Sequence, residues 1–173
     1  MKVLICASLS LLSIAAQAGD IVRYLLPDGS KFPIANAVEV PAGTVLVFQS
    51  GATASPKDPS AAPGTPEYWG DTKTQTVSAL ENIKKSLAAE GLDFGDAVKM
   101  LAFLAGDPAN GGKMDFKGFM EGYTQYFGTP EQPNLPARST VQVAALAAPG
   151  ALVEIELVLA KKSAKMPTKK AKH

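Results

Sequence analysis

Three charged side chains in the C-terminal part of the chain could carry chemistry. They are Arg138, Glu154 and Glu156, and the two glutamates lie within a run of apolar residues. A guanidinium can bind a carboxylate through two parallel hydrogen bonds, which the ammonium group of a lysine cannot do. A glutamate can relay a proton during hydrolysis. The residues alone leave two alternatives equally open: Arg138 binds a small carboxylate, or it forms an internal ion pair with one of the two glutamates.

The sequence has few of the side chains that other catalytic mechanisms need. The single histidine is His173 at the end of the chain, and the single cysteine is Cys6 near its beginning. We therefore expect no metal site, no Ser-His-Asp triad and no Cys-His pair. The glycine-rich stretch from Gly106 to Lys113 lacks the Gly-Lys-Ser/Thr ending of a phosphate-binding loop. We predict no cofactor.

The stretch from Asn134 to Ala160 predicts a β-hairpin that positions these charges. Pro149-Gly150 has the chemistry of a turn and separates two runs rich in Val, Ile and Leu. Arg138 would lie at the start of the first strand. Alternation along the second strand would place Glu154 and Glu156 on one side. Four apolar residues would occupy the other side: Val153, Ile155, Leu157 and Leu159.

The rest of the chain predicts further strands and two helices. Strands are expected at 21–26, 37–40, 44–49 and 97–105, with a turn at Ser50-Gly51 and a long loop at 54–70. Tyr68 and Trp69 close that loop, and pinning it to the body is favoured over lining a pocket. One helix would open with a capping box at Thr72 and Gln75, and a second would run from Asp115 to Gly128 with an aromatic stripe.

This order of elements predicts an α+β fold. A single mixed β-sheet would carry two helices packed on one face. The opposite face would be partly apolar, which favours association with other chains.

The motif "PARSTVQVA…GALVEIE" resembles the C-terminal signature of the Rid/YjgF family, also called endoribonuclease L-PSP or reactive intermediate deaminase. The order of strands and helices is similar too, and the resemblance covers roughly residues 34–160. It implies a chorismate-mutase-like domain that assembles as a homotrimer, with ligand clefts between subunits.

The resemblance also implies a reaction and a site. Arg138 would clamp the carboxylate of a 2-imino or enamine acid, and Glu154 would position the water that hydrolyses it to a 2-keto acid and ammonia. Ser50, Gly51 and the backbone at Thr140 would contact the substrate. The alternative is a non-catalytic homologue that binds a small carboxylate, and an endoribonuclease fits less well. This sequence differs from many family members at two positions of the implied pocket wall. It has Ala37 where they have tyrosine, and Met120 where they have asparagine.

Both ends of the chain look different from the middle. Lys2, the apolar run 3–15 and the sequence Ala16-Gln17-Ala18 predict a signal peptide over residues 1–18, because the run is too short for a membrane anchor. The mature protein would then begin at Gly19 and be periplasmic or secreted. Residues 19–160 would form the domain, and the Lys-rich tail 161–173 would be disordered. Loss of Lys2 brings the formal charge from +1 to zero, so we expect no nucleic acid partner.

Overall fold

The computed structural model describes residues 19–161, so the predicted signal peptide and nearly all of the predicted tail lie outside the described residues. Its main elements, in chain order, are β1 (Val22–Tyr24), β2 (Ala37–Glu39), β3 (Val45–Thr53), α1 (Pro66–Trp69), α2 (Thr72–Ala89), β4 (Ala97–Ala105), α3 (Phe116–Tyr123), β5 (Ala137–Val143) and β6 (Val153–Lys161). Short 3-10 turns lie at Pro27–Gly29, Phe94–Asp96 and Pro108–Asn110.

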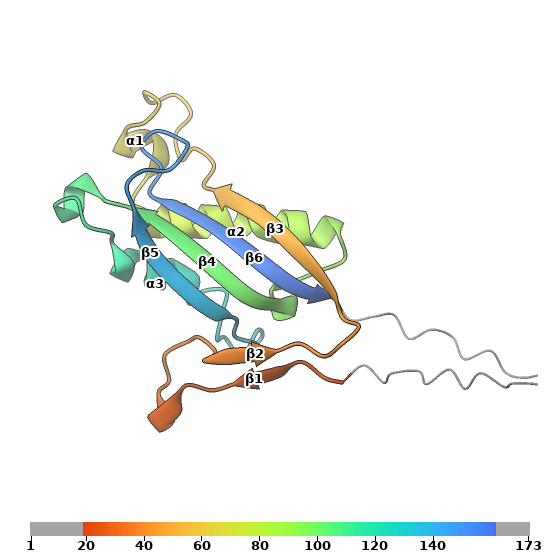
Figure 1. The fold of residues 1–173 in the computed structure, drawn as a ribbon. Coiled ribbons are helices and arrows are strands. Elements are labelled where there is room, and N and C mark those ends of the chain that lie inside the picture. Colours follow the sequence, from red (N-terminus) through yellow and green to blue (C-terminus); the bar gives the residue numbers. More distant parts are fainter. Residues whose placement is uncertain (1–18, 162–173) are drawn as a thin grey trace, which may run out of the picture.

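The main β-sheet is mixed and has the strand order β3-β6-β4-β5 (Figure 1). Strand β6 runs antiparallel to both of its neighbours, whereas β5 runs parallel to β4. The predicted hairpin of β5 and β6 is therefore wrong, because β4 lies between these two strands. The sequence of β4, AVKMLAFLA, is apolar nearly throughout, as expected of a strand that is paired on both edges. The turn at Pro149-Gly150 belongs to a crossover past the end of β4.

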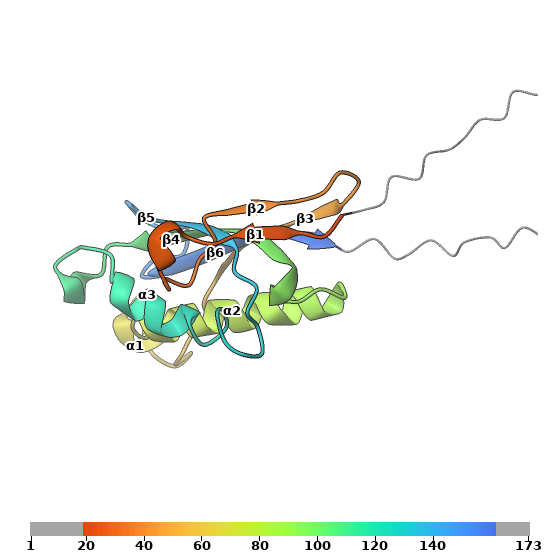
Figure 2. The same cartoon turned by 90° about the horizontal axis from the view of Figure 1, so that it is seen from below.

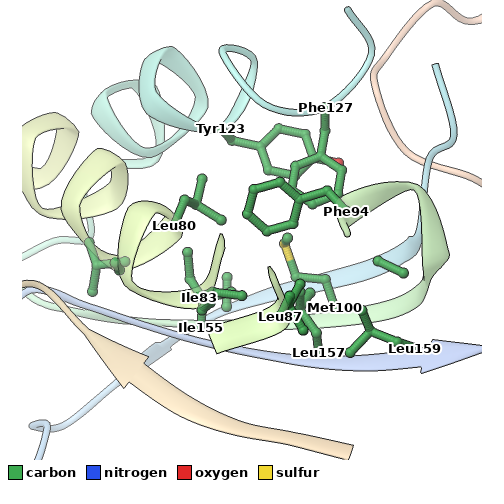
Figure 3. Packing of buried hydrophobic residues seen from close by; sticks show 14 of the residues in the cluster. Leu80, Ile83, Leu87, Phe94, Met100, Tyr123, Phe127, Ile155, Leu157 and Leu159 are labelled. Carbon is green, nitrogen blue, oxygen red and sulfur yellow. The ribbon is translucent and has the colours of Figure 1, made fainter. Parts of the chain in front are cut away.

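Helices α2 and α3 cover one face of this sheet, which confirms the predicted layers (Figure 2). The apolar side chains of β6 that alternate toward the helices are buried: Val153, Ile155, Leu157 and Leu159. They pack with Leu80, Ile83 and Leu87 of α2 and with Tyr123 and Phe127 (Figure 3). Removing any of these large side chains would cost about 2–5 kcal/mol of folding free energy.

The start of α2 and the end of α3 differ from the prediction. The cap of α2 is Asp71, whose carboxylate accepts a hydrogen bond from the Thr74 amide, so Thr72 is the first helical residue. Gln75 instead links the start of α2 to the residue before β6, because its side-chain carbonyl oxygen accepts a hydrogen bond from the Leu152 amide at 2.8 Å. Asp115 caps α3 as predicted, but that helix ends at Tyr123 and not near Gly128. Successive turns after it return Phe127 to the core.

Strands β1 and β2 form a separate antiparallel ribbon beside the start of β5 (Figure 1). Arg23 fastens this ribbon to the body, since its guanidinium donates hydrogen bonds at 2.9–3.0 Å to the carbonyl oxygens of Gly95, Ala97 and Leu135. A β-bridge between Ala35 and Ala137 joins the ribbon's connection to the outer edge of β5.

Trp69 pins the long loop, as predicted. It is buried, and its indole nitrogen donates a hydrogen bond of 2.8 Å to the Pro149 carbonyl. The uncovered face of the sheet carries large apolar side chains, among them Phe48, which is 74% exposed. No helix within residues 19–161 is both long and apolar enough to cross a membrane.

Candidate functional site

Arg138 points toward the helix layer from the edge strand β5. It is paired with Met100 of β4, which is fully buried on the helix side. Three aromatic rings surround its guanidinium carbon, with centroids at 4.3 Å for Tyr123, 5.1 Å for Phe119 and 5.5 Å for Phe32. Such distances allow cation–π attraction, which holds the charged group in place without using its hydrogen bonds.

The guanidinium of Arg138 has unused hydrogen-bond donors. Its Nη2 contacts the Met120 thioether sulfur at 3.2 Å, and its buried Nη1 has no hydrogen-bond partner in the part of the chain that the structure describes. Within residues 19–161 it makes no salt bridge, so the internal ion pair with Glu154 or Glu156 does not form in this chain. Burial lowers the pKa of Arg138, and the neighbouring Tyr123 opposes that shift. A half-buried cation with a free, buried donor is suited to receive an anion.

Thr140 lies two residues further along β5 and therefore on the same side. It is paired with the buried Ala102, and its hydroxyl oxygen is also buried without a partner. Beyond the bridge at Ala137, the outer edge of β5 has no strand partner among the described residues. We call Arg138 and Thr140 the arginine half-site.

Glu154 lies at the start of β6, close to Gly51. The predicted Ser50-Gly51 turn is instead a bulge inside β3, where the pairing with β6 shifts between Gln49 and Ala52. A Cβ atom added to Gly51 would overlap the Glu154 carboxylate, so the glycine makes room for it. Bulges of this kind re-aim backbone and side chains within a sheet. We call Ser50, Gly51 and Glu154 the glutamate half-site.

The two half-sites lie on opposite faces of the sheet. Arg138 shares its face with Met100 and Leu157, which are paired in register and buried under the helices. Glu154 is paired with Phe103 and lies one residue out of phase with the buried Ile155, so it faces away from the helices. Successive residues of a strand point to opposite sides, so one chain cannot bring Arg138 and Glu154 to the same small ligand.

Glu156 lies on the same uncovered face as Glu154. It lines an open hollow of about 250 Å³ together with Ser50, Lys99 and Val158. It is therefore a residue of the uncovered surface and not an ion-pair partner of Arg138.

Of the side chains around Arg138, sequence reasoning missed Phe32 entirely. Phe119 and Tyr123 belong to the predicted aromatic stripe, and they are fully buried and also contact the guanidinium. Phe32 precedes β2 in an irregular segment, where no periodicity marks which way a side chain points. Met120 was identified only as a departure from relatives, and its sulfur proves to contact Arg138.

Comparison with known proteins agrees with this fold. A model of the family described as endoribonuclease L-PSP matches residues 29–161. Protein DfrA of Myxococcus xanthus is 40% identical over 128 residues, which make up 73% of this chain and 83% of that protein. The 2-iminobutanoate/2-iminopropanoate deaminase of Rattus norvegicus is 39% identical over 101 residues, or 58% of this chain and 64% of that protein.

A solved structure is similar as well. The crystal structure of E. coli TdcF with bound serine has a TM-score of 0.53 and 30% sequence identity, and covers 78% of this chain and 92% of that one. Since the family model spans most of the sequence, this chain belongs to the endoribonuclease L-PSP family, also known as the Rid/YjgF family.

Proposed function

We propose that the protein hydrolyses 2-imino or enamine acids to 2-keto acids and ammonia. The unpaired Nη1 donor of Arg138 is the observation that carries this proposal. At family level, imine deamination is supported by the name of the rat relative. The bound serine in TdcF, a small carboxylate, supports the same ligand class.

The arginine half-site would hold the substrate. A carboxylate that meets Nη1 of Arg138 supplies the acceptor that this nitrogen lacks, and the surrounding rings strengthen the ion pair by excluding water. Thr140 would contribute its backbone on the open edge of β5. This contact orients the C=N carbon of the imine toward the catalytic group.

The glutamate half-site would supply the water. Glu154 accepts a proton from water as the oxygen attacks the C=N carbon, and it passes this proton to the imine nitrogen, which gives a carbinolamine. Glu154 then relays the hydroxyl proton to the amine as the C–N bond breaks and the C=O bond forms, so that ammonia leaves and the carboxylate is restored. Ser50 and Gly51 line this side, and the absence of a side chain at Gly51 leaves the carboxylate its place.

The site would form between two copies of the chain, within a homotrimer. Arg138 and Glu154 lie on opposite faces of one sheet, so a complete site needs each from a different copy. The unpaired edge of β5 and the exposed apolar side chains of the uncovered face, such as Phe48, are suited to that contact. Light scattering at micromolar concentration should give the mass of a trimer, and a monomer mass would remove this arrangement.

Activity is tested by generating an imino acid with an amino-acid oxidase and measuring release of the keto acid. The wild-type protein should accelerate release, and Arg138→Ala should lose about 30- to 1000-fold in affinity for a stable keto acid. Glu154→Gln should bind that keto acid but turn over poorly. Unchanged binding in a folded Arg138→Ala variant would contradict the clamp.

A non-catalytic carboxylate-binding protein is the second candidate. It is favoured by the described groups that contact the guanidinium of Arg138, which include three aromatic rings and a thioether but no carboxylate. Binding of the keto acid that depends on Arg138, without any acceleration of imine hydrolysis, would select this function. An endoribonuclease is less favoured, because the only histidine of the chain is His173.

We also propose that the protein is exported to the periplasm or secreted, on the basis of the A-x-A sequence at residues 16–18. Mass spectrometry of protein from the exporting host should identify Gly19 as the first residue. A membrane-retained species that keeps Met1 would contradict this.

A further inference from the structure

Phe32 differs from the other rings around Arg138 because it is not locked in the core. Phe119 and Tyr123 are fully buried, whereas Phe32 is 40% exposed. It comes from the segment between β1 and β2, not from the helix layer. Since Nη1 of Arg138 is covered, a carboxylate can reach it only when a covering group moves. Phe32 is the ring of the three that can move without opening the core.

Phe32 continues outward into a second exposed ring. It stacks on Phe116, the first residue of α3, with centroids 6.3 Å apart and planes inclined by 21°. Phe116 is 37% exposed and in turn lies 6.3 Å from Phe119. The rings of Phe32, Phe116 and Phe119 therefore form a continuous apolar cluster, in which Phe119 is buried beside the guanidinium and Phe32 and Phe116 reach the solvent.

The groups around this cluster are mostly apolar, so a polar substrate side chain would have few hydrogen-bond partners there. The described groups in contact with the guanidinium of Arg138 include three aromatic rings and the Met120 thioether. The hydroxyl of Tyr123 is already engaged, because it donates a hydrogen bond of 2.8 Å to the Pro33 carbonyl. The part of a bound substrate that lies toward Phe32 and Phe116 would thus meet aromatic rings, while its carboxylate lies at Arg138.

We propose that Phe32 and Phe116 form the side-chain subsite of the carboxylate site and select substrates with a large apolar, above all aromatic, side chain. Phe32 moves aside as the carboxylate reaches Arg138 and then packs against the side chain of the substrate. This inference rests on the proposed function, since it takes Arg138 as the carboxylate clamp. It adds the class of side chain that the site accepts.

The test compares two stable keto acids, phenylpyruvate and pyruvate, by calorimetric titration of the whole protein. The wild-type protein should bind phenylpyruvate about 10- to 100-fold more tightly, because burial of a phenyl ring adds apolar area that pyruvate lacks. In Phe32→Ala and in Phe116→Ala this preference should fall to about 3-fold or less. Leu25→Ala is the matched control, since Leu25 lies in the same segment, is 79% exposed and should leave the preference as it is.

The outcomes separate the subsite from the clamp. A wild-type preference near one, with pyruvate binding that depends on Arg138, would overturn the subsite alone. A preference that both folded phenylalanine variants retain would overturn it as well. Binding of neither keto acid would overturn the clamp and the subsite together. A loss of preference in both variants, but not in Leu25→Ala, would support the subsite whether or not imine hydrolysis is found.

Discussion

The two arginines of this protein should respond in opposite ways to the same substitution. Arg23 donates hydrogen bonds to three backbone carbonyls, whereas Arg138 contacts rings and a sulfur and leaves Nη1 unpaired. Methionine keeps much of the length of the side chain and removes the charge. We therefore expect Arg23→Met to weaken the fold, and Arg138→Met to remove carboxylate binding while leaving the fold nearly as stable.

The magnitudes follow from the contacts. Arg23→Met loses three charge-assisted hydrogen bonds and removes this donor from the carbonyl oxygens of Ala97 and Leu135, whereas the Gly95 carbonyl keeps a hydrogen bond from the Asn134 side-chain amide; the loss should cost about 2–4 kcal/mol. Arg138→Met loses cation–π attraction worth about 0.5–2 kcal/mol. It also removes an unsatisfied buried donor, which costs the native protein about 1–3 kcal/mol. These two terms nearly cancel, so its free energy of unfolding should change by less than about 1 kcal/mol.

Urea unfolding followed by fluorescence of Trp69, the single tryptophan, measures both changes. Protein concentration must be the same in all samples, because stability depends on it if the chains associate. If Arg138→Met destabilises the protein as much as Arg23→Met does, Arg138 is a structural residue and the reasoning fails. Equal stability of all three proteins would instead refute the role given to Arg23.

Three further results are expected. Glu154→Gln keeps the size of the side chain but removes the base, so turnover should fall by about 10²–10⁴ while keto-acid affinity changes little; single-turnover kinetics would show this. Gly51→Ala should lower turnover by about 10-fold or more, because the added Cβ displaces the Glu154 carboxylate. An unchanged turnover rate would refute that packing. Burial raises the pKa of Tyr123 to about 12 from the ordinary value of 10.0. The folded state favours the neutral phenol, so this stability is present below pH 10 and is lost as the pH rises toward 12. Tyr123→Phe should make the loss of unfolding free energy across that window smaller by about 3 kcal/mol, measured by urea titration at each pH.

The layers of the fold could be predicted from the sequence because they follow from periodicity. The alternation of Val153, Ile155 and Leu157 identifies a half-covered strand, and the cap at Asp115 marks the start of a helix. Which strands lie next to each other in the sheet could not be predicted in the same way. Nothing local in β5 or β6 indicates that β4 lies between them, since pairing depends on contacts far apart in the sequence.

The candidate residues could be named from their motif, but their arrangement could not. The phase of Arg138 relative to Glu154 depends on how β5 and β6 align with β4, and the bulge at Gly51 changes the course of β3. Phe32 lies in a segment without periodicity, so its contact with Arg138 arises only from the folded chain. The aromatic surroundings of Arg138 could therefore be identified only from the folded structure.

Mixing two inactive variants tests most directly the claim that Arg138 and Glu154 act together from different copies. Arg138→Ala and Glu154→Gln each lack one half-site and should be inactive alone. After subunit exchange in an equal mixture, about a quarter of the interfaces would pair an intact Arg138 with an intact Glu154. The account predicts recovery of about a quarter of the wild-type rate of imine hydrolysis. No recovery, after mass spectrometry has shown that mixed oligomers formed, would contradict it.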